Sequence, residues 1–226
     1  FYLAPMEGIT GYIVRNAYAH YFPYIDKYFT PFIPAAKKMS KKIKRDLAAE
    51  NNDQIRLVPQ LIGNRADEFL MMIRQLEELG FTSVNLNFGC PSGTVVSKRK
   101  GAGFLADPKE LEMLLEEVLE NSPLAVSVKT RVGIKDPDEW EALCGVYAKF
   151  PLEELIIHPR LQKDYYSGTP RMETFARALE QIHVPLCYNG DICSVEDYKK
   201  VTAAFRAIDR IMTVSYTHLR AHETDQ

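Results

Sequence analysis

The chain alternates eight short apolar runs, rich in β-branched and aromatic residues, with segments that have helical periodicity. Most of the runs are continuously apolar rather than alternating, which is typical of strands buried on both faces of a parallel sheet. This alternation constrains the fold more than any other feature. The predicted strands are Tyr2–Pro5, Tyr28–Ile33, Leu57–Ile62, Ser83–Asn87, Ala125–Thr130, Glu154–His158, Pro185–Tyr188 and Arg210–Val214.

Helix start signals stand between these runs. Asn64, Asp107 and Ser194 occupy capping positions, and Pro108 with Glu110 completes the first turn of the second helix. Eight strands with intervening helices favour an α/β fold of the (β/α)8 TIM-barrel type over an open doubly wound sheet. Too little chain follows the eighth run for a final helix, so we expect the barrel to be incomplete at its eighth βα unit.

Composition agrees with a folded domain of this kind. The 226 residues are 46% hydrophobic and 26% charged, which suits one α/β barrel or two small domains. The net charge of −2 gives no global signal for nucleic-acid binding, although local basic patches can still supply one.

The cysteines indicate a reducing compartment. Cys90, Cys144, Cys187 and Cys193 show neither metal-ligand spacing nor a disulfide framework, so we expect a cytoplasmic protein without a metal site. No apolar run approaches the roughly 20 residues that span a bilayer. The chain opens on Phe1 rather than Met, so a missing start could hide a signal peptide.

The last residues break the pattern. Residues 215–226 are polar, lack a capped amphipathic pattern, and resemble the translated sequencing-adapter ends of assembled environmental reading frames. We therefore expect one catalytic barrel domain over residues 1–214, followed by a tail that is not native. Resequencing the locus tests this, because finding the same codons before a natural stop would contradict it.

Polar side chains gather at the ends of the predicted strands. In a barrel these ends all open on one face, which carries the active site. Each residue alone has a structural explanation, such as a rim ion pair for Lys129, a satisfied core histidine for His158, or a tight turn at Asn189-Gly190. Stability alone does not account for a lysine, a histidine, arginines, amides and a thiol on one rim.

The most informative strand end is Asn87-Phe88-Gly89-Cys90-Pro91. Pro91 restricts the backbone of Cys90 to extended geometry, so the thiol is held in one conformation at an edge. Unpaired cysteines are often simply buried small hydrophobes. The polar rim around Cys90 favours a reactive role instead.

The strand-end motifs resemble those of the tRNA-dihydrouridine synthase family from Phe1 to about Val214. The chain carries them in order as Ala4-Pro5-Met6, Asn87-Phe88-Gly89-Cys90-Pro91, Val128-Lys129-Thr130-Arg131-Val132-Gly133, Ile157-His158-Pro159-Arg160 and Tyr188-Asn189-Gly190-Asp191-Ile192.

The resemblance implies a barrel with FMN lying across the strand ends and NADPH as the reductant. A cation beside the N1–C2 region stabilises reduced flavin, which is one way in which a protein tunes this cofactor. By position, the implied FMN contacts are Pro5 and Met6 at the isoalloxazine, Gln60 and Lys129 at its polar edge, His158 beside them, and Asn189, Gly190 and Asp191 at the ribityl-phosphate tail.

The implied reaction is reduction of a uridine C5=C6 bond in tRNA, with hydride to C6 and a proton from Cys90 to C5. The base must leave the folded tRNA to reach the pocket. Asn87 could bind the uracil edge. Residues that could contact tRNA around the mouth are Lys98, Arg99, Arg131, Arg160 and Tyr166.

The chain departs from the family at its end. Thr213-Val214-Ser215-Tyr216 stands where the family has a Gly-Arg-type loop that completes the phosphate site. From the resemblance we also expect the sequence to end before the family's C-terminal helical tRNA-binding domain. We therefore expect this chain, as written, to bind FMN and tRNA poorly, and a flavin-to-protein ratio near one would contradict that expectation.

Two other functions remain open from the sequence. A dihydroorotate dehydrogenase-like flavin barrel that acts on a free pyrimidine would share the lysine and the phosphate site, but it needs no basic surface beside Cys90. A non-catalytic RNA-binding relative would need no thiol acid. No stable protein partner is evident, and we expect a monomer without membrane association.

Overall fold

The structure is a computed structural model, and it describes residues 1–206, 208 and 210–213. Ten parallel strands form one sheet in the order β3-β5-β6-β7-β8-β9-β10-β1-β2-β4. The strands are β1 (Tyr2–Leu3), β2 (Lys27–Phe29), β3 (Ile33–Pro34), β4 (Leu57–Val58), β5 (Gln60–Ile62), β6 (Ser83–Phe88), β7 (Ala125–Arg131), β8 (Glu154–His158), β9 (Leu186–Asn189) and β10 (Arg210–Thr213).

These strands correspond to eight extended segments. Pro59, which has no backbone N–H to donate, separates β4 from β5, and three residues separate β2 from β3. Because β2 pairs with β4 while β3 pairs with β5, the two edges of the sheet lie on neighbouring segments and the strands form a ring. The predicted barrel architecture is therefore confirmed.

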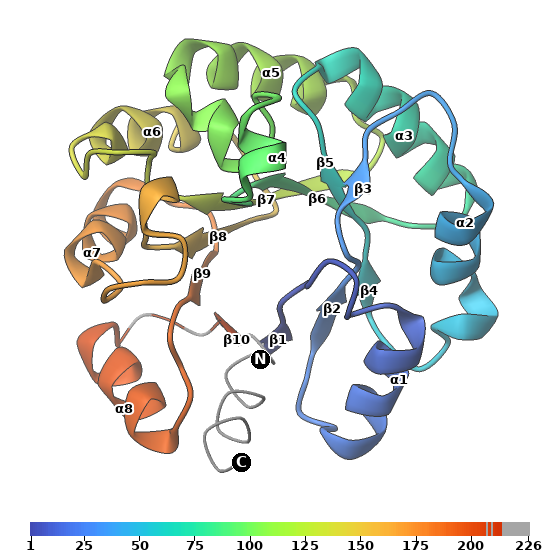
Figure 1. Ribbon diagram of the computed structural model, residues 1–226, viewed down its shortest axis with the longest axis horizontal. Helices are drawn as coiled ribbons and strands as arrows, with labels where there is room; N and C mark the ends of the chain where they lie inside the picture. The colour runs from blue at the N-terminus through green and yellow to red at the C-terminus, as the bar shows by residue number, and fades with distance from the viewer. Residues whose placement is uncertain (207, 209, 214–226) are drawn as a thin grey trace.

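Helices lie outside the strand ring (Figure 1). They are α1 (Tyr12–Tyr21), α2 (Lys41–Leu47), α3 (Ala66–Glu78), α4 (Gly93–Val96), α5 (Pro108–Asn121), α6 (Glu139–Tyr147), α7 (Met172–Gln181) and α8 (Val195–Ala204), with the short 3₁₀ helices η1 (Ala49–Asn51), η2 (Gly101–Ala106) and η3 (Gln162–Asp164). The eighth strand segment is β10. The predicted tail after residue 214, including the position expected for the phosphate loop, lies outside the described residues.

Side-chain caps mark the starts of α2, α5 and α8. Asp107 accepts from the backbone of Lys109 and Glu110, and the Ser194 hydroxyl accepts from Asp197, as the sequence predicts. The prediction for Asn64 is wrong. α3 begins after Arg65, and the Asn64 amide donates instead to the Lys98 carbonyl at 3.1 Å, where it joins the start of α3 to the segment after α4.

Two layers of apolar side chains stabilise the barrel. The larger layer lies between strands and helices and includes Phe69, Phe88 and Leu115, each fully buried. The smaller layer fills part of the ring interior with Tyr2, Ala4, Phe29, Val58, Ile156, Cys187 and Met212. Within the described residues, no helix combines the length and the apolar character that crossing a bilayer requires.

Candidate active site

The parallel register brings the predicted rim residues together. Asn87 at the end of β6 is paired with Lys129 on β7, and Arg131 at the end of β7 is paired with His158 on β8. All four lie at the carboxyl ends of their strands. This is the face of a barrel on which active sites are built.

Cys90 follows β6 and is held firmly by its backbone. Its N–H donates to Asn87 Oδ1 at 2.9 Å, and its carbonyl accepts from Ala102 at 3.0 Å. Gly101 has a φ of +55°, and a Cβ there would lie 2.8 Å from the Cys90 carbonyl oxygen. Only glycine combines that backbone conformation with this close approach. The segment after β6 therefore folds back and fixes the half-buried thiol.

The environment of the Cys90 thiol has two opposing effects. Burial raises its pKa above the ordinary value, so the sulfur keeps its proton at neutral pH. The Ser92 backbone, Lys129 and Arg131 each lower the pKa and so favour the thiolate. A protonated thiol whose conjugate base is stabilised by neighbouring cations is suited to donating a proton.

Lys129 is a half-buried cation. Among the described residues its ammonium has no hydrogen-bond or ion-pair partner. Burial, followed by the nearby Arg131 charge, lowers its pKa from the ordinary value of 10.5 to about 8. An uncompensated ammonium beside a thiol at a barrel mouth is costly unless it meets an electron-rich ligand.

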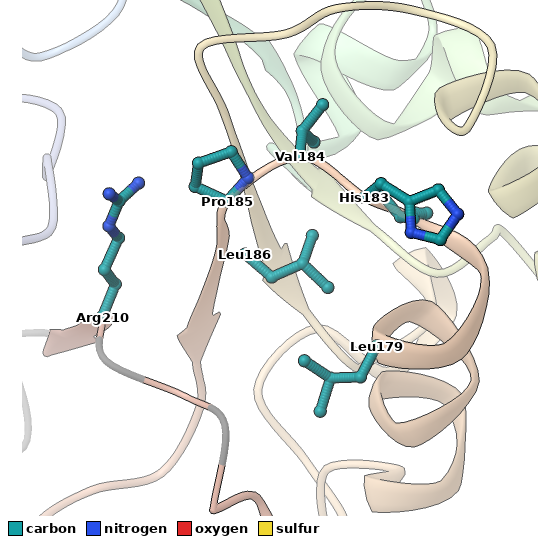
Figure 2. A pocket seen from close by; sticks show the side chains of 7 residues that line it. Leu179, His183, Val184, Pro185, Leu186 and Arg210 are labelled. Carbon is teal, nitrogen blue, oxygen red and sulfur yellow. The ribbon is translucent and has the colours of Figure 1, made fainter.

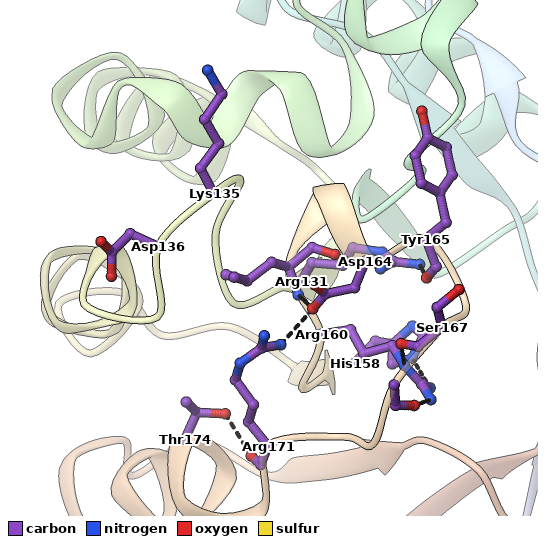
Figure 3. Close-up of polar contacts among 12 residues, drawn as sticks. Arg131, Lys135, Asp136, His158, Arg160, Asp164, Tyr165, Ser167, Arg171 and Thr174 are labelled. Carbon is purple, nitrogen blue, oxygen red and sulfur yellow. Dashed lines mark hydrogen bonds and ion pairs between the residues drawn. The ribbon is translucent and has the colours of Figure 1, made fainter.

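His158 lies at the end of β8 and is held by Arg160 (Figure 3). Burial, followed by the charges of Arg131, Lys129 and Arg160, lowers the pKa of His158 well below its ordinary value. The imidazole is therefore neutral at physiological pH, and its Nε2 accepts from Arg160 Nη1 at 3.1 Å. Its other nitrogen, Nδ1, then carries the ring proton.

Arg160 does not face solvent. Its guanidinium forms a bidentate ion pair with Asp191, donates to the Ser167 carbonyl at 3.1 Å, and also donates to the Gly168 carbonyl. The residue is 1% exposed. Its donors fix the loop after β8 and hold Asp191, and the contact with tRNA phosphates stays a prediction for Arg160.

Arg131 is buried in the same way. It is 1% exposed and donates to the carbonyls of Gly89, Leu161 and Tyr165, at 3.0, 2.8 and 2.6 Å. Its contact with tRNA stays a prediction. Its role in this structure is to tie the end of β6, immediately before Cys90, to the loop after β8.

Gln60 and Asn87 are also committed to the protein. Gln60 has no exposed surface, and its amide contacts Asn85 and Asn87, while its contact with a flavin stays a prediction. Asn87 is 7% exposed and accepts from the backbone of Gly89 and Cys90. In this structure Asn87 thus supports the backbone of Cys90, and its contact with a uracil edge stays a prediction.

The remaining predicted cofactor residues lie on the same end of the barrel. Pro5 and Met6 follow β1 and are half-buried. Asn189 ends β9 and donates to the Met212 carbonyl at 3.0 Å. Gly190 lies against the Tyr188 ring, where a Cβ would be 2.4 Å from the hydroxyl oxygen, so this position requires glycine.

Three predicted tRNA-contact residues are exposed. Lys98 and Arg99 lie just after α4, and Arg99 pairs with Glu110 at 2.6 Å. Tyr166 is 69% exposed, and the Arg131 guanidinium carbon lies 5.5 Å from its ring centre. Tyr166 therefore presents an aromatic surface at the mouth while its ring rests on a buried cation.

Among the cavities lined by described residues, two lie at opposite ends of the barrel. A cavity of about 380 Å³ is lined by Asp164, Ser167, Gly168, Thr169 and Arg171 of the loop after β8, where Arg171 pairs with Asp164 (Figure 3). A cavity of about 300 Å³ lies where β9 and β10 begin, next to Pro185 and Arg210 (Figure 2). Only the first is on the face that carries Cys90.

Sequence reasoning missed two supports of the site. Asn85 lies two residues before Asn87 on β6, so both side chains point to the same face of the sheet. The Asn-x-Asn spacing in the sequence could have indicated this shared face. Gly101 follows the basic residues after Cys90, and nothing in its local sequence indicated the packing against the Cys90 carbonyl.

Comparison with known proteins shows the family of the chain. The model of the dihydrouridine synthase family matches residues 2–214. The chain belongs to the dihydrouridine synthase family. A tRNA-dihydrouridine(16) synthase of Pseudomonas putida is 31% identical over 207 residues, which are 88% of this chain and 64% of that protein. A tRNA-dihydrouridine(20/20a) synthase of Vibrio parahaemolyticus is 32% identical, over 69% of this chain and 52% of that protein. The chain thus spans less than two thirds of the length of these dihydrouridine synthases.

Solved structures with similar folds are more distant in sequence. Morphinone reductase in complex with tetrahydroNAD superposes with a TM-score of 0.64 at 9% identity, covering 94% of this chain and 81% of that one. Histamine dehydrogenase from a Rhizobium species gives a TM-score of 0.70 at 11% identity, covering 99% and 45%. At these identities the likeness concerns the barrel fold alone.

Proposed function

We propose that this chain is the catalytic barrel of an FMN- and NADPH-dependent oxidoreductase that reduces uridine in tRNA to dihydrouridine. The observation that carries the proposal is the placement of a protonated, backbone-locked thiol beside an uncompensated lysine at the mouth of a barrel in a dihydrouridine synthase family member. Relatives named as tRNA-dihydrouridine synthases support the substrate.

The residues present fit FMN in part. Lys129 supplies a half-buried positive charge without a partner among the described residues, which an electron-rich ring edge would compensate. Pro5, Met6 and the Asn189-Gly190 turn surround the same end of the barrel. Neutral His158 can donate through Nδ1. Bound FMN would supply the hydride that C6 of the uracil ring receives.

The chain's own contribution to the chemistry is the second hydrogen. Cys90 Sγ–H donates its proton to C5, so the C5=C6 bond becomes saturated and the sulfur is left as a thiolate. Lys129 and Arg131 stabilise this thiolate, since both lower the thiol pKa. Solvent then returns a proton to the sulfur, which restores the starting state.

The mouth offers a surface for an extruded base. Tyr166 presents its exposed ring, and Lys98 and Arg99 lie on the segment after Cys90. Aromatic stacking contributes about 1–3 kcal/mol per base. Lys98 and Arg99 can approach the phosphates on either side of the flipped uridine, whereas Arg131 and Arg160 are buried.

The decisive test uses the full-length gene in its host. We expect deletion followed by complementation with Cys90→Ala to leave most sites unreduced, because losing a general acid costs about 10²- to 10⁴-fold in rate. Cys193→Ala, which removes an exposed thiol elsewhere, is the matched control and should restore dihydrouridine. Mass mapping at tRNA positions 16, 20 and 20a would read the outcome. Normal dihydrouridine in the Cys90→Ala strain would contradict the assignment.

A second measurement separates tRNA from a free pyrimidine. We expect reduced full-length enzyme to be reoxidised by tRNA lacking dihydrouridine, and not by uracil or orotate. Reoxidation by orotate alone would contradict the tRNA proposal and favour a dehydrogenase of free pyrimidines.

A further inference from the structure

Four buried polar side chains form one hydrogen-bonded row inside the barrel. Asn87 Nδ2 donates to Gln60 Oε1 at 2.8 Å, Gln60 Nε2 to Asn85 Oδ1 at 2.8 Å, and Asn85 Nδ2 to Ser127 Oγ at 3.0 Å. None of the four is more than 7% exposed. Gln60, Asn85 and Ser127 are also in register across β5, β6 and β7, so three of the four lie in one interior layer.

The direction of the row is fixed at both ends by backbone groups. At one end Asn87 Oδ1 accepts from the Gly89 and Cys90 N–H groups, at 3.0 and 2.9 Å. At the other end the Ser127 hydroxyl donates to the Val84 carbonyl at 3.1 Å. A backbone N–H only donates and a carbonyl only accepts, so each amide between them has a single orientation that satisfies its neighbours.

Stability alone does not explain this row. Other interior positions of the same barrel carry apolar side chains, among them Phe29, Val58, Ile156 and Met212. Apolar residues of matching shape can replace a buried hydrogen-bonded pair at little cost. What a fully satisfied, one-directional row adds is orientation, since turning any one amide places two donors or two acceptors face to face.

We propose that Asn85 and Ser127 are positioning residues that act through Gln60 and Asn87 to hold the backbone of Cys90. The role of the positioned thiol as proton donor rests on the function proposed above. When Asn85 or Ser127 loses its polar group, the amides between it and Cys90 can turn. Asn87 then presents its NH2 group to the Cys90 N–H. The strand end loosens, and the thiol becomes more exposed.

The test measures the rate at which iodoacetamide alkylates Cys90 as a function of pH. The full-length protein carries Cys193→Ser, and peptide mass mapping identifies the alkylated cysteine. Charged groups around the thiol are Lys129, Arg131 and Glu7, and none is altered. We expect Asn85→Leu to lower the apparent pKa of Cys90 by about one unit, which makes alkylation near neutral pH about tenfold faster. Ser127→Ala, a milder change, should shift it in the same direction by less.

Leu86→Val is the matched control, because it trims a fully buried side chain between Asn85 and Asn87 without touching the row. All variants are compared well below their melting temperatures. If the Leu86→Val profile matches wild type while those of Asn85→Leu and Ser127→Ala shift, positioning is supported. Unchanged profiles in folded Asn85→Leu and Ser127→Ala, or an equal shift in Leu86→Val, would overturn it.

Turnover gives a second readout in the same variants. Misplacing a reacting group costs on the order of 10- to 100-fold in rate, so kcat for tRNA reduction should fall in Asn85→Leu while KM for tRNA stays near wild type. A rise in KM alone would contradict positioning. If wild-type protein reduces no uridine but the alkylation profiles separate as expected, the proposed function fails and the positioning of Cys90 stands.

Discussion

The two ends of the barrel treat buried charge in opposite ways. At the end where the strands begin, the fully buried carboxylate of Glu154 accepts from the Tyr2 hydroxyl at 2.7 Å and lies 3.3 Å from Lys27 Nζ and 3.1 Å from Arg210 Nη1. At the end where the strands finish, Lys129 has no ion-pair partner among the described residues. Glu154 and its cations compensate one another, whereas the charge of Lys129 has no such partner within the residues that the structure describes, although Arg160 on the same face is paired with Asp191.

The pKa values follow this contrast. At the carboxyl ends of the strands, burial lowers the pKa of Lys129 to about 8 and that of Arg131 to about 10, and a neighbouring arginine adds to each shift, Arg131 for Lys129 and Arg160 for Arg131. The lesson is that the same residue types stabilise the barrel at one end and prepare a binding site at the other. Stability measurements can therefore separate the two ends.

The largest expected effect is at Glu154. Glu154→Leu leaves Lys27 and Arg210 without their shared carboxylate, and breaking a buried ion pair from one side costs about 3–5 kcal/mol. Urea unfolding should show this loss. The matched change Glu112→Leu breaks an exposed pair with Lys149 and should cost under about 1 kcal/mol. Equal losses in the two variants would remove the distinction between compensated and surface charge.

The second prediction concerns Lys129→Met. The pKa of Lys129 is lowered on folding, so between about pH 8 and 10.5 the unfolded chain binds more protons than the folded chain. Wild-type stability should therefore rise with pH relative to the variant, by on the order of 1–2 kcal/mol after allowing for partial exposure.

Unfolding of wild type and Lys129→Met in parallel from pH 7 to 9.5 measures this difference. At pH 7 the variant should be at least as stable as wild type, since it removes a half-buried charge that has no ion-pair partner in the described part of the chain. A large loss at pH 7 would show that Lys129 supports the fold, as Glu154 does. Flavin retention by the full-length protein should nevertheless fall in the variant.

The barrel architecture was predictable because it depends on the pattern of apolar residues over whole segments and not on single side chains. Continuous apolar runs such as 155–157 and 185–188 are typical of strands that are buried on both faces of a covered parallel sheet. Once eight such strands are parallel, their carboxyl ends must share a face. That is why Cys90, Lys129 and His158 could be grouped from sequence before any contact was known.

The roles of the arginines were not predictable in the same way. A sequence shows that Arg131 and Arg160 are charged, but their burial depends on the path of the loop after β8, which supplies the carbonyls of Leu161, Tyr165 and Ser167. Five N–H donors on a guanidinium can be satisfied by carbonyls as well as by phosphate. Only the tertiary arrangement decides between them.

The smallest expected effect is at His158, at the carboxyl ends of the strands. It concerns the stability of the protein at acidic pH. Because burial and three neighbouring cations lower its pKa, the folded protein keeps this imidazole neutral while the unfolded chain binds a proton below about pH 6.5. Stability should therefore be lost as pH falls from 6.5 towards 5, by about 1 kcal/mol per pH unit at most.

His158→Gln removes the titrating ring but keeps an acceptor for Arg160, so its stability should fall less steeply over that range. His183→Gln, at an exposed position beside β9, is the matched control. Parallel curves for wild type and His158→Gln would mean that the imidazole is protonated in the folded state. The neighbouring cations would then have too little effect to lower the pKa of His158. The contrast between the two ends of the barrel would rest on Lys129 alone.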